Sequence, residues 1–241
     1  MWIAPVPPPS PENRLIAVVI PAHNEEQLIG ACLRSMRVAA RCPALLGEAV
    51  VAIVVLDACT DDTARIATAM GALCVAVQAG NVGRARAHGA ELALKVGARW
   101  LAFTDADTVV ASDWLSMQMI LRSDAVCGVV EVHDWTPHCE RTRLRFNAHY
   151  RPVDGHRHVH GANLGVSAQA YRRAGGFRPV ATSEDKALVD DLHTCGIAIA
   201  WSAAPRVVTS ARRGFRAPGG FGATLERMGT AGLYLPAAMP V

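Results

Sequence analysis

The stretch that decides the fold class is Leu15-Ile-Ala-Val-Val-Ile20, which runs directly into Pro21-Ala-His-Asn-Glu-Glu26. Its apolar, β-branched first half is typical of a strand that is buried on both faces. Further runs of this kind occupy residues 50–56, 73–77 and 100–104. We therefore expect four buried strands in the first half of the chain.

Between these runs lie stretches with helical spacing, one over residues 28–39 and another over 87–96. Strands that alternate with helices indicate βαβ units and a mostly parallel sheet, so the predicted fold class is α/β in a single domain. A further strand is expected at 125–130. Residues 132–160 are polar, rich in His and Arg and without clear periodicity, which predicts a long functional loop. Regular structure is predicted again near 162–167, followed by a helix from about 183 to 194 and short strands near 197–201 and 207–209.

Composition narrows the functional classes without choosing among them. The chain has 241 residues, enough for one core, and its net charge of +3 includes no Lys/Arg block of the kind that binds nucleic acid. Seven scattered cysteines without a C-x-x-C pair argue against a disulfide framework or a zinc ribbon. We therefore expect a cytoplasmic protein without a nucleic-acid partner.

Neither terminus resembles a targeting or membrane-spanning segment. The Pro-rich residues 1–13 lack the pattern of a signal peptide, and no apolar run approaches the roughly 20 residues that span a bilayer. The predicted protein is soluble. The short apolar stretch 231–241 leaves open a peripheral membrane contact or a contact with another subunit.

Acidic residues follow three of the predicted strands. Glu25 and Glu26 follow the first, Asp57 ends the second, and Asp105-Ala-Asp107 follows the fourth. Ligands of open α/β sheets bind at the carboxyl ends of strands, and clustered carboxylates repel one another unless a cation offsets the charge. Oxygen ligands of this kind suit Mg²⁺ or Mn²⁺ at a diphosphate. The alternative for Asp-x-Asp alone is a turn or helix cap.

Taken in order, these motifs resemble the nucleotide-sugar half of family 2 glycosyltransferases, which have the GT-A fold. The similarity rests on Val-Val-Ile-Pro-Ala-His-Asn-Glu-Glu26, Asp57-x-x-Thr-Asp-Asp-Thr63, Asn81-x-Gly and Phe-Thr-Asp-Ala-Asp107. It covers residues 15 to about 110. Gly161-Ala-Asn163 and Ser183-Glu-Asp185 extend it to about 195.

The resemblance implies donor-binding roles for several residues. It places Pro21, Ala22 and Glu25 around the nucleoside, with Glu25 near the ribose. It implies that Asp57 accepts a hydrogen bond from the base, although an Asx turn or helix cap is the alternative reading of this residue.

Asn81 and Arg84 would face the donor diphosphate, which suits both a helix N-terminus and a guanidinium. For Arg84 the alternative is a solvated helix face. Asp107 would be the principal ligand of Mn²⁺ or Mg²⁺, and Asp105 would contact the ribose, or the metal through water.

The resemblance also implies where catalysis and acceptor binding occur. Glu184 and Asp185 match the acidic pair that supplies the general base of inverting members, with Asp185 the stronger candidate. Thr182-x-x-Asp185 also fits a capping box, in which Asp185 merely satisfies a backbone N–H. Gly161, Ala162 and Asn163 would bind the acceptor.

Two features differ from the family pattern, and a third, the row of histidines, is not assigned by it. The Q-x-x-R-W signature of processive synthases is absent, which predicts a non-processive enzyme. The basic group that closes over the diphosphate in many members has only weak candidates here, namely Arg212, Arg213 and Arg216. Alternating His156, His158 and His160 would share one face of a strand; we favour an acceptor-binding role within the 133–160 segment over a second metal site.

The function predicted is metal-dependent transfer of a sugar from a nucleoside diphosphate sugar to a hydroxyl of a small or lipid-linked acceptor, with inversion. Two alternatives are a sugar-nucleotide-forming nucleotidyltransferase and a non-catalytic nucleotide-binding relative. The predicted organisation is a Pro-rich segment (1–13) and one GT-A domain (14–241), with a donor-binding half at 14–110 and an acceptor-binding half at 111–215. The donor base, the sugar, the acceptor and the oligomeric state are not specified.

Overall fold

The computed structural model describes residues 14–213 and 220–230. The Pro-rich segment 1–13, the apolar stretch 231–241 and Arg216 lie outside these ranges. Backbone contacts divide the chain into two compact units. The first comprises Met1–His133 and Pro152–Ser210, and the second comprises Asp134–Arg151 and Ala211–Val241. Within the ranges described, no helix is long and apolar enough to cross a membrane.

The first unit is built on one mixed sheet with the strand order β3-β2-β1-β4-β7-β6-β8-β5. The strands are β1 (Leu15–Ala22), β2 (Ala49–Asp57), β3 (Leu73–Val77), β4 (Trp100–Phe103), β5 (Thr108–Val110), β6 (Ala125–Glu131), β7 (Leu164–Ser167) and β8 (Ile199–Thr209). The pairs that join β1 to β2, β1 to β4 and β2 to β3 are parallel, so their carboxyl ends meet at one edge. The α/β sheet expected from the sequence is thereby confirmed.

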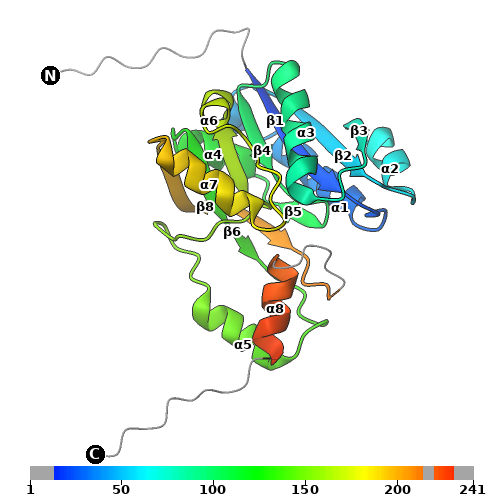
Figure 1. Ribbon diagram of the computed structural model, residues 1–241, viewed down its shortest axis with the longest axis vertical. Coiled ribbons are helices and arrows are strands. Elements are labelled where there is room, and N and C mark those ends of the chain that lie inside the picture. Colours follow the sequence, from blue (N-terminus) through cyan, green and yellow to red (C-terminus); the bar gives the residue numbers. More distant parts are fainter. Residues whose placement is uncertain (1–13, 214–219, 231–241) are drawn as a thin grey trace, which may run out of the picture. The chain divides into compact units, whose positions relative to one another are not determined.

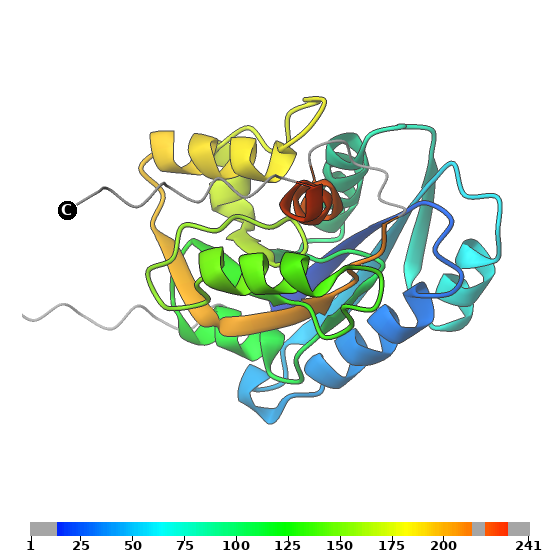
Figure 2. The same ribbon diagram turned by 90° about the horizontal axis from the view of Figure 1, so that it is seen from below.

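Helices cover both faces of this sheet. They are α1 (Ile29–Ala39), the short 3₁₀ helix η2 (Pro43–Leu45), α2 (Thr63–Ala69), α3 (Val82–Lys95), α4 (Trp114–Ile120), α6 (Ala168–Arg173) and α7 (Glu184–Thr194). Helices α3, α6 and α7 lie on one face, and α1 and α4 lie on the other (Figures 1 and 2). Because α3 and α7 share a face and contact each other, their side chains can meet above the central strands.

Close packing of α3 on the sheet fixes the position of this helix. Val19 and Val55, on β1 and β2, are fully buried beneath it. A Cβ atom added at Gly89 would lie 2.4 Å from Cγ1 of Val19 and 2.8 Å from Cγ2 of Val55, so only glycine allows this approach. The helix is therefore held against the two strands whose ends begin the candidate site.

Two sequence-based expectations about regular structure need correction. Residues 199–209 form one strand, β8, in place of the two strands predicted near 197–201 and 207–209, because a register shift between Cys127 and Val129 of β6 lets the pairing continue past Pro205. The segment 132–160, expected to be a loop, contains helix α5 (Glu140–His149). This helix buries only Thr142 and Phe146, too few residues to produce a helical pattern in the sequence.

In the second unit α5 packs against helix α8 (Phe221–Thr230). The Phe146 ring lies 5.8 Å from that of Phe221, edge to face. Arg141 donates to the carbonyl of Gly229, and Arg145 donates to the carbonyl of Met228 at 2.7 Å. These contacts place cationic side chains at the C-terminal turn of α8, where the helix dipole favours them.

Candidate functional site

Loops that follow β1, β2 and β3, here called the strand-end loops (residues 22–26, 57–63 and 78–81), are held together by hydrogen bonds. The N–H of Glu25 donates to Oγ1 of Thr63 at 2.7 Å, and the N–H of Thr60 donates to Oδ1 of Asn24 at 2.8 Å. The parallel register pairs Ala22 with Leu56, which brings the loops side by side. Glu25 is only 6% exposed.

The predicted nucleoside residues therefore do lie at one edge of the sheet. Pro21 and Ala22 end β1, and Glu25 follows within the same loop. The carbonyl of Ala22 accepts from the thiol of Cys59 in the adjacent loop. The role of these three residues toward a nucleoside stays a prediction.

Asp57 joins β2 to the loop before α3. Its Oδ1 accepts the N–H groups of Ala79 at 2.7 Å and Gly80 at 3.0 Å, and its Oδ2 accepts that of Asn81 at 3.3 Å. Asp57 is 8% exposed and holds the loop before α3 in place, through partners too far along the chain for an Asx turn. Its predicted contact with the base stays a prediction.

Asn81 is the N-cap of α3. Its Oδ1 accepts the N–H of Arg84 at 2.9 Å, and its Nδ2 donates to the carbonyl of Val180, ahead of α7. The Arg84 side chain is exposed. An asparagine cap of this kind stabilises a helix by about 1 kcal/mol, so Asn81 has a structural function in addition to its predicted place at the donor.

Five residues after this N-cap, in the same helix, lies a residue that the sequence reading did not select. Arg86 is 3% exposed. One guanidinium nitrogen, Nη2, donates to Oδ1 of Asp105 at 2.5 Å, and the other, Nη1, donates to Oε1 of Glu184. Although burial lowers its pKa, the charges of Asp105, Glu184 and Asp185 raise it overall. We call these four residues the Arg86 cluster.

The sequence did contain a signal for Arg86. In α3 the buried positions include Gly89, Ala90 and Ala93, which lie three, four and seven residues after Arg86 and so share its helix face. An arginine on an otherwise small and apolar stripe requires a buried partner of opposite charge. The neighbouring Arg84 lies outside that stripe and is solvated.

Two glycines provide the space that the Arg86 cluster occupies. A Cβ atom at Gly161 would lie 2.4 Å from the Arg86 guanidinium carbon, and one at Gly83 would lie 2.9 Å from Cβ of Glu184. Such distances are too short for real atoms. Gly161, predicted to bind the acceptor, therefore lies directly against the guanidinium.

Glu184 and Asp185 form the first turn of α7 and point to different partners. Glu184 is 6% exposed and pairs with Arg86; burial raises its carboxyl pKa, and the Arg86 charge opposes that rise. Asp185 is half-buried, and its Oδ2 accepts the N–H of Gly161 at 2.8 Å. Both carboxylates thus face the 161–163 segment or the guanidinium beside it.

The helix begins one residue later than predicted, at Glu184, with Ser183 as its N-cap. Ser183 has a left-handed backbone with φ of 59° and makes no side-chain cap hydrogen bond. Asp185 Oδ1 accepts the N–H of Lys186 at 2.7 Å rather than an N–H at Thr182. This geometry does not match the capping box that competed with the general-base reading.

Asp105 and Asp107 follow β4 as predicted, and both are half-buried. The carbonyl of Asp105 accepts from the Cys32 thiol at 3.4 Å, and Oδ1 of Asp107 accepts from Oγ1 of Thr108 at 3.4 Å. Burial, then the charges of Asp105 and Asp107, raise the pKa of Cys32. Both carboxylates are thus close enough to act on one thiol.

Asn163 has an interior position. Its Oδ1 accepts from Nε1 of Trp114 at 2.8 Å, and its Nδ2 donates to the carbonyls of Val129 and Pro205. The side chain is 1% exposed and joins β6, β8 and α4. Its neighbour Ala162 is 6% exposed. Their role in acceptor binding stays a prediction.

His156, His158 and His160 lie in one row, as the alternation in sequence suggested, although the segment is not a strand. Their rings stack with centroids 5.4 Å and 6.2 Å apart. Burial, then the neighbouring imidazoles, lowers the pKa of His160 to about 3. In the part of the chain that the structure describes, no group of three or more His, Cys, Asp or Glu could hold a metal ion.

The basic residues proposed to close over a diphosphate fall in the second unit. Arg212 is half-buried and Arg213 is exposed, while Arg216 is among the residues not described. Their predicted role stays a prediction.

Comparison with solved structures finds the same fold in several glycosyltransferases. S. aureus TarS 1-349 in complex with UDP-GlcNAc is 14% identical, with a TM-score of 0.64 over 88% of this chain and 64% of that one. The mannosyltransferase PcManGT from Pyrobaculum calidifontis, in complex with GDP-Man and Mn²⁺, is 19% identical, with a TM-score of 0.61 over 87% and 60%.

Glucosyl-3-phosphoglycerate synthase from Mycobacterium tuberculosis, in complex with Mn²⁺, UDP and glucosyl-3-phosphoglycerate, is 20% identical, with a TM-score of 0.58 over 90% and 76%. The chain spans 36% of the length of TarS and 60% of TarS 1-349. Among proteins of curated function, none matches this sequence.

The sequence profile described as Glycosyl transferase family 2 matches residues 17–179, which is more than half of the chain. That range includes the strand-end loops, Arg86, Asp105 and Asp107, and it ends just before α7. The fold of the first unit agrees with this assignment. The chain therefore belongs to glycosyl transferase family 2 and has the GT-A fold.

Proposed function

We propose that this protein transfers a sugar from a nucleoside diphosphate sugar to a hydroxyl group, with inversion at the anomeric carbon. The observation that carries the proposal is the Arg86 cluster. It joins the Asp-x-Asp segment after β4, where the family places the donor, to the acidic pair at the start of α7, where it places the base. Structural neighbours solved with UDP-GlcNAc or GDP-Man support a nucleotide-sugar donor.

Asp107 and Asp105 would hold Mn²⁺ or Mg²⁺. Only one oxygen of Asp105 is paired with Arg86, and two protein carboxylates with phosphate oxygens and water suit these ions. When bound, the ion would neutralise charge on the diphosphate leaving group. Two solved neighbours contain Mn²⁺, which supports this choice of cofactor.

Different residues of this chain would accept the proton, orient the base and bind the donor. Asp185 accepts the proton of the acceptor hydroxyl while that oxygen forms a bond to the anomeric carbon and the bond to the diphosphate oxygen breaks. The hydrogen bond from Gly161 orients Asp185. Asn81 and Arg84, at the start of α3, face the diphosphate, and Pro21, Ala22, Glu25 and Asp57 surround the nucleoside.

The first experiment is a thermal-shift panel with UDP, GDP, dTDP, CDP and ATP, each with Mn²⁺ and with EDTA. A ligand that binds only the folded state raises the melting temperature by mass action. We expect a shift that requires Mn²⁺ with one nucleoside diphosphate. A shift with ATP alone would favour a nucleotidyltransferase, and no shift with any nucleotide would contradict the proposal.

Replacing Asp107 with Ala tests the metal assignment. We expect the Mn²⁺-dependent shift to disappear and donor turnover to fall by about 10³-fold, because an ion that stabilises a leaving group contributes several kcal/mol. The melting temperature without ligand should stay close to that of the wild type. Turnover that survives in Asp107→Ala would show that another residue holds the ion.

A further inference from the structure

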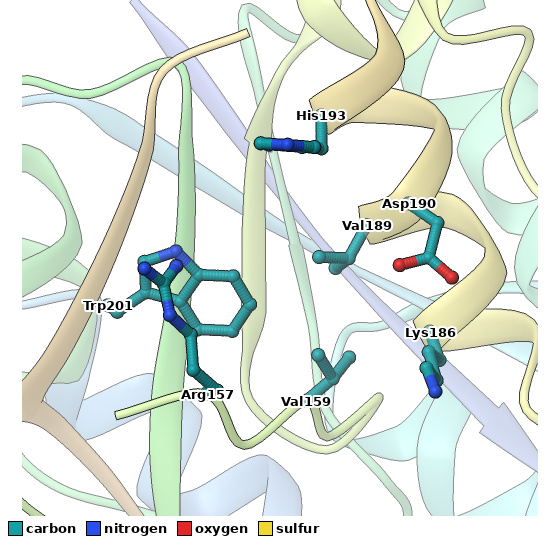
Figure 3. A pocket seen from close by; sticks show the side chains of 7 residues that line it. All are labelled: Arg157, Val159, Lys186, Val189, Asp190, His193 and Trp201. Carbon is teal, nitrogen blue, oxygen red and sulfur yellow. The ribbon is translucent and has the colours of Figure 1, made fainter. Parts of the chain in front are cut away.

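A pocket of about 380 Å³ lies beside α7 and is not accounted for by the donor site (Figure 3). One wall is a single stripe of α7 formed by Lys186, Val189, Asp190 and His193, which are spaced as i, i+3, i+4 and i+7. Its volume is within the range of small-molecule sites, about 300–1,000 Å³.

The opposite wall of the pocket comes from the 157–159 segment and from β8. Figure 3 shows Val159 facing α7, and the Arg157 guanidinium carbon lies 5.2 Å from the centre of the Trp201 ring. All these residues belong to the first unit. The pocket is therefore formed within one compact unit of the chain.

Both walls include residues that lie close in the sequence to the proposed general base or to its hydrogen-bond donor. Lys186 follows Asp185 directly, and Val159 precedes by two residues Gly161, whose N–H donates to Asp185. With a rise of about 1.5 Å per residue, the stripe from Lys186 to His193 extends roughly 10 Å along the helix. A ligand with one end near Asp185 could therefore lie along this stripe.

The residues that line the pocket indicate which kind of ligand it could bind. Val159, Val189 and the Trp201 ring form an apolar surface against which the carbon face of a ring can pack. Arg157 and Lys186 are exposed cations, and within residues 14–213 and 220–230 neither is paired with a carboxylate. Asp190, also exposed, can accept hydrogen bonds from hydroxyl groups.

We propose that this pocket binds the acceptor and that the acceptor is a hydroxylated small acid, whose carboxylate or phosphate pairs with Arg157 and Lys186. The inference rests on the proposed function, because it assigns the acceptor side of the same reaction. Two cations on an apolar floor favour an acid over a neutral sugar. Charge-assisted hydrogen bonds are about twice as strong as neutral ones, which corresponds to a preference of about tenfold or more.

Binding can be tested without turnover. The chain has five tryptophans, so ¹⁵N-labelled indole resonances are few, and Trp201→Phe identifies the one from Trp201. The probes are glucuronate, glucose 6-phosphate, inorganic phosphate and glucose. We expect the two sugar acids to shift the Trp201 resonance with at least about tenfold higher affinity than glucose. A larger response to inorganic phosphate than to both sugar acids would reduce the site to an anion contact and overturn the proposal.

Variants connect the response to the pocket. The double substitution Arg157→Ala with Lys186→Ala should abolish the acid preference, whereas Arg172→Ala, which removes an exposed arginine from α6, should retain it. Equal responses to glucose and glucuronate in the wild type, or an acid preference that persists in the double variant, would overturn the proposal.

The acceptor role is tested by measuring the rate at which the nucleoside diphosphate is released from the donor. The donor used is the one whose nucleotide the thermal-shift panel identifies. Sugar acids should accelerate release, and the double variant should raise their KM by about tenfold while the nucleotide affinity stays unchanged. If nucleotides bind but sugar acids neither shift Trp201 nor accelerate release, this inference fails alone. If no nucleotide binds, the proposed function fails, and the acceptor assignment fails with it.

Discussion

The strand-end loops and the Arg86 cluster each contain a buried carboxylate, Asp57 in the loops and Glu184 in the cluster, but the partners of the two groups differ. In the loops, Asp57 accepts three backbone N–H groups. In the cluster, Asp105 and Glu184 accept from a buried guanidinium. Replacing the Asp57 carboxylate leaves neutral N–H donors without an acceptor. Replacing Arg86 instead leaves the carboxylate of Glu184 buried without a counter-charge. The cluster should therefore tolerate substitution less well than the loops.

The largest effect is expected for Arg86→Ala. Glu184 would remain buried without a counter-charge, and breaking a buried ion pair of this kind costs about 3–5 kcal/mol in the free energy of unfolding. Chemical denaturation measures this loss. Arg84→Ala, two residues away on the exposed face of α3, is the matched control and should change the unfolding free energy by less than about 0.5 kcal/mol. Equal losses in the two variants would mean that the buried pair is not what stabilises the cluster.

The substitution Asp185→Asn tests whether Asp185, within the Arg86 cluster, acts in catalysis or only in stability. The amide keeps an oxygen for the Gly161 N–H but cannot accept the proton of an acceptor hydroxyl. Turnover should fall by about 10²–10⁴-fold, and the nucleotide-induced thermal shift should be preserved. A variant that loses thermal stability but keeps its turnover would assign Asp185 a structural role instead.

Asp57→Asn tests the loop side of the comparison. One carboxylate oxygen becomes an amide nitrogen, so at least one of the N–H groups from Ala79, Gly80 and Asn81 loses its acceptor. We expect a loss of about 1–3 kcal/mol in the free energy of unfolding. A cost as large as that of Arg86→Ala would remove the distinction between the two regions.

The effect that is smallest near neutral pH concerns the protonation of His160. Its pKa in the folded protein, about 3, lies below the usual value of 6.5, so the unfolded chain binds a proton that the folded chain does not. The stability that a neutral His160 contributes is present above about pH 6.5 and is lost as the pH falls toward 3. The slope from one such group is at most about 1.4 kcal/mol per pH unit. His160→Gln should flatten the dependence of the unfolding free energy on pH over this range, and an unchanged slope would contradict the assignment.

A structural element could be predicted when the pattern that identifies it lies within a short stretch of the sequence. Buried strands such as β1 are apolar along their whole length, and acidic residues at their ends follow from the strand limits, so Asp57, Asp105 and Asp107 could be located in advance. Helix α5 could not, because it buries few residues and its partner α8 lies some 70 positions later in the chain. Periodicity reports burial only when most of one helix face is covered.

The order of amino acids is enough to give the α/β class, the strand ends that carry the acidic residues and the membership in glycosyl transferase family 2. The three-dimensional packing, in contrast, determines that Arg86, rather than Arg84, contacts Asp105 and Glu184. It also determines that Asn163 is an interior hydrogen-bonding residue and that Lys186 shares a pocket with Trp201. The physical reason is that a charge or an amide takes its role from partners far away in the chain, and the packing of α3 and α7 on one face of the sheet brings those partners together.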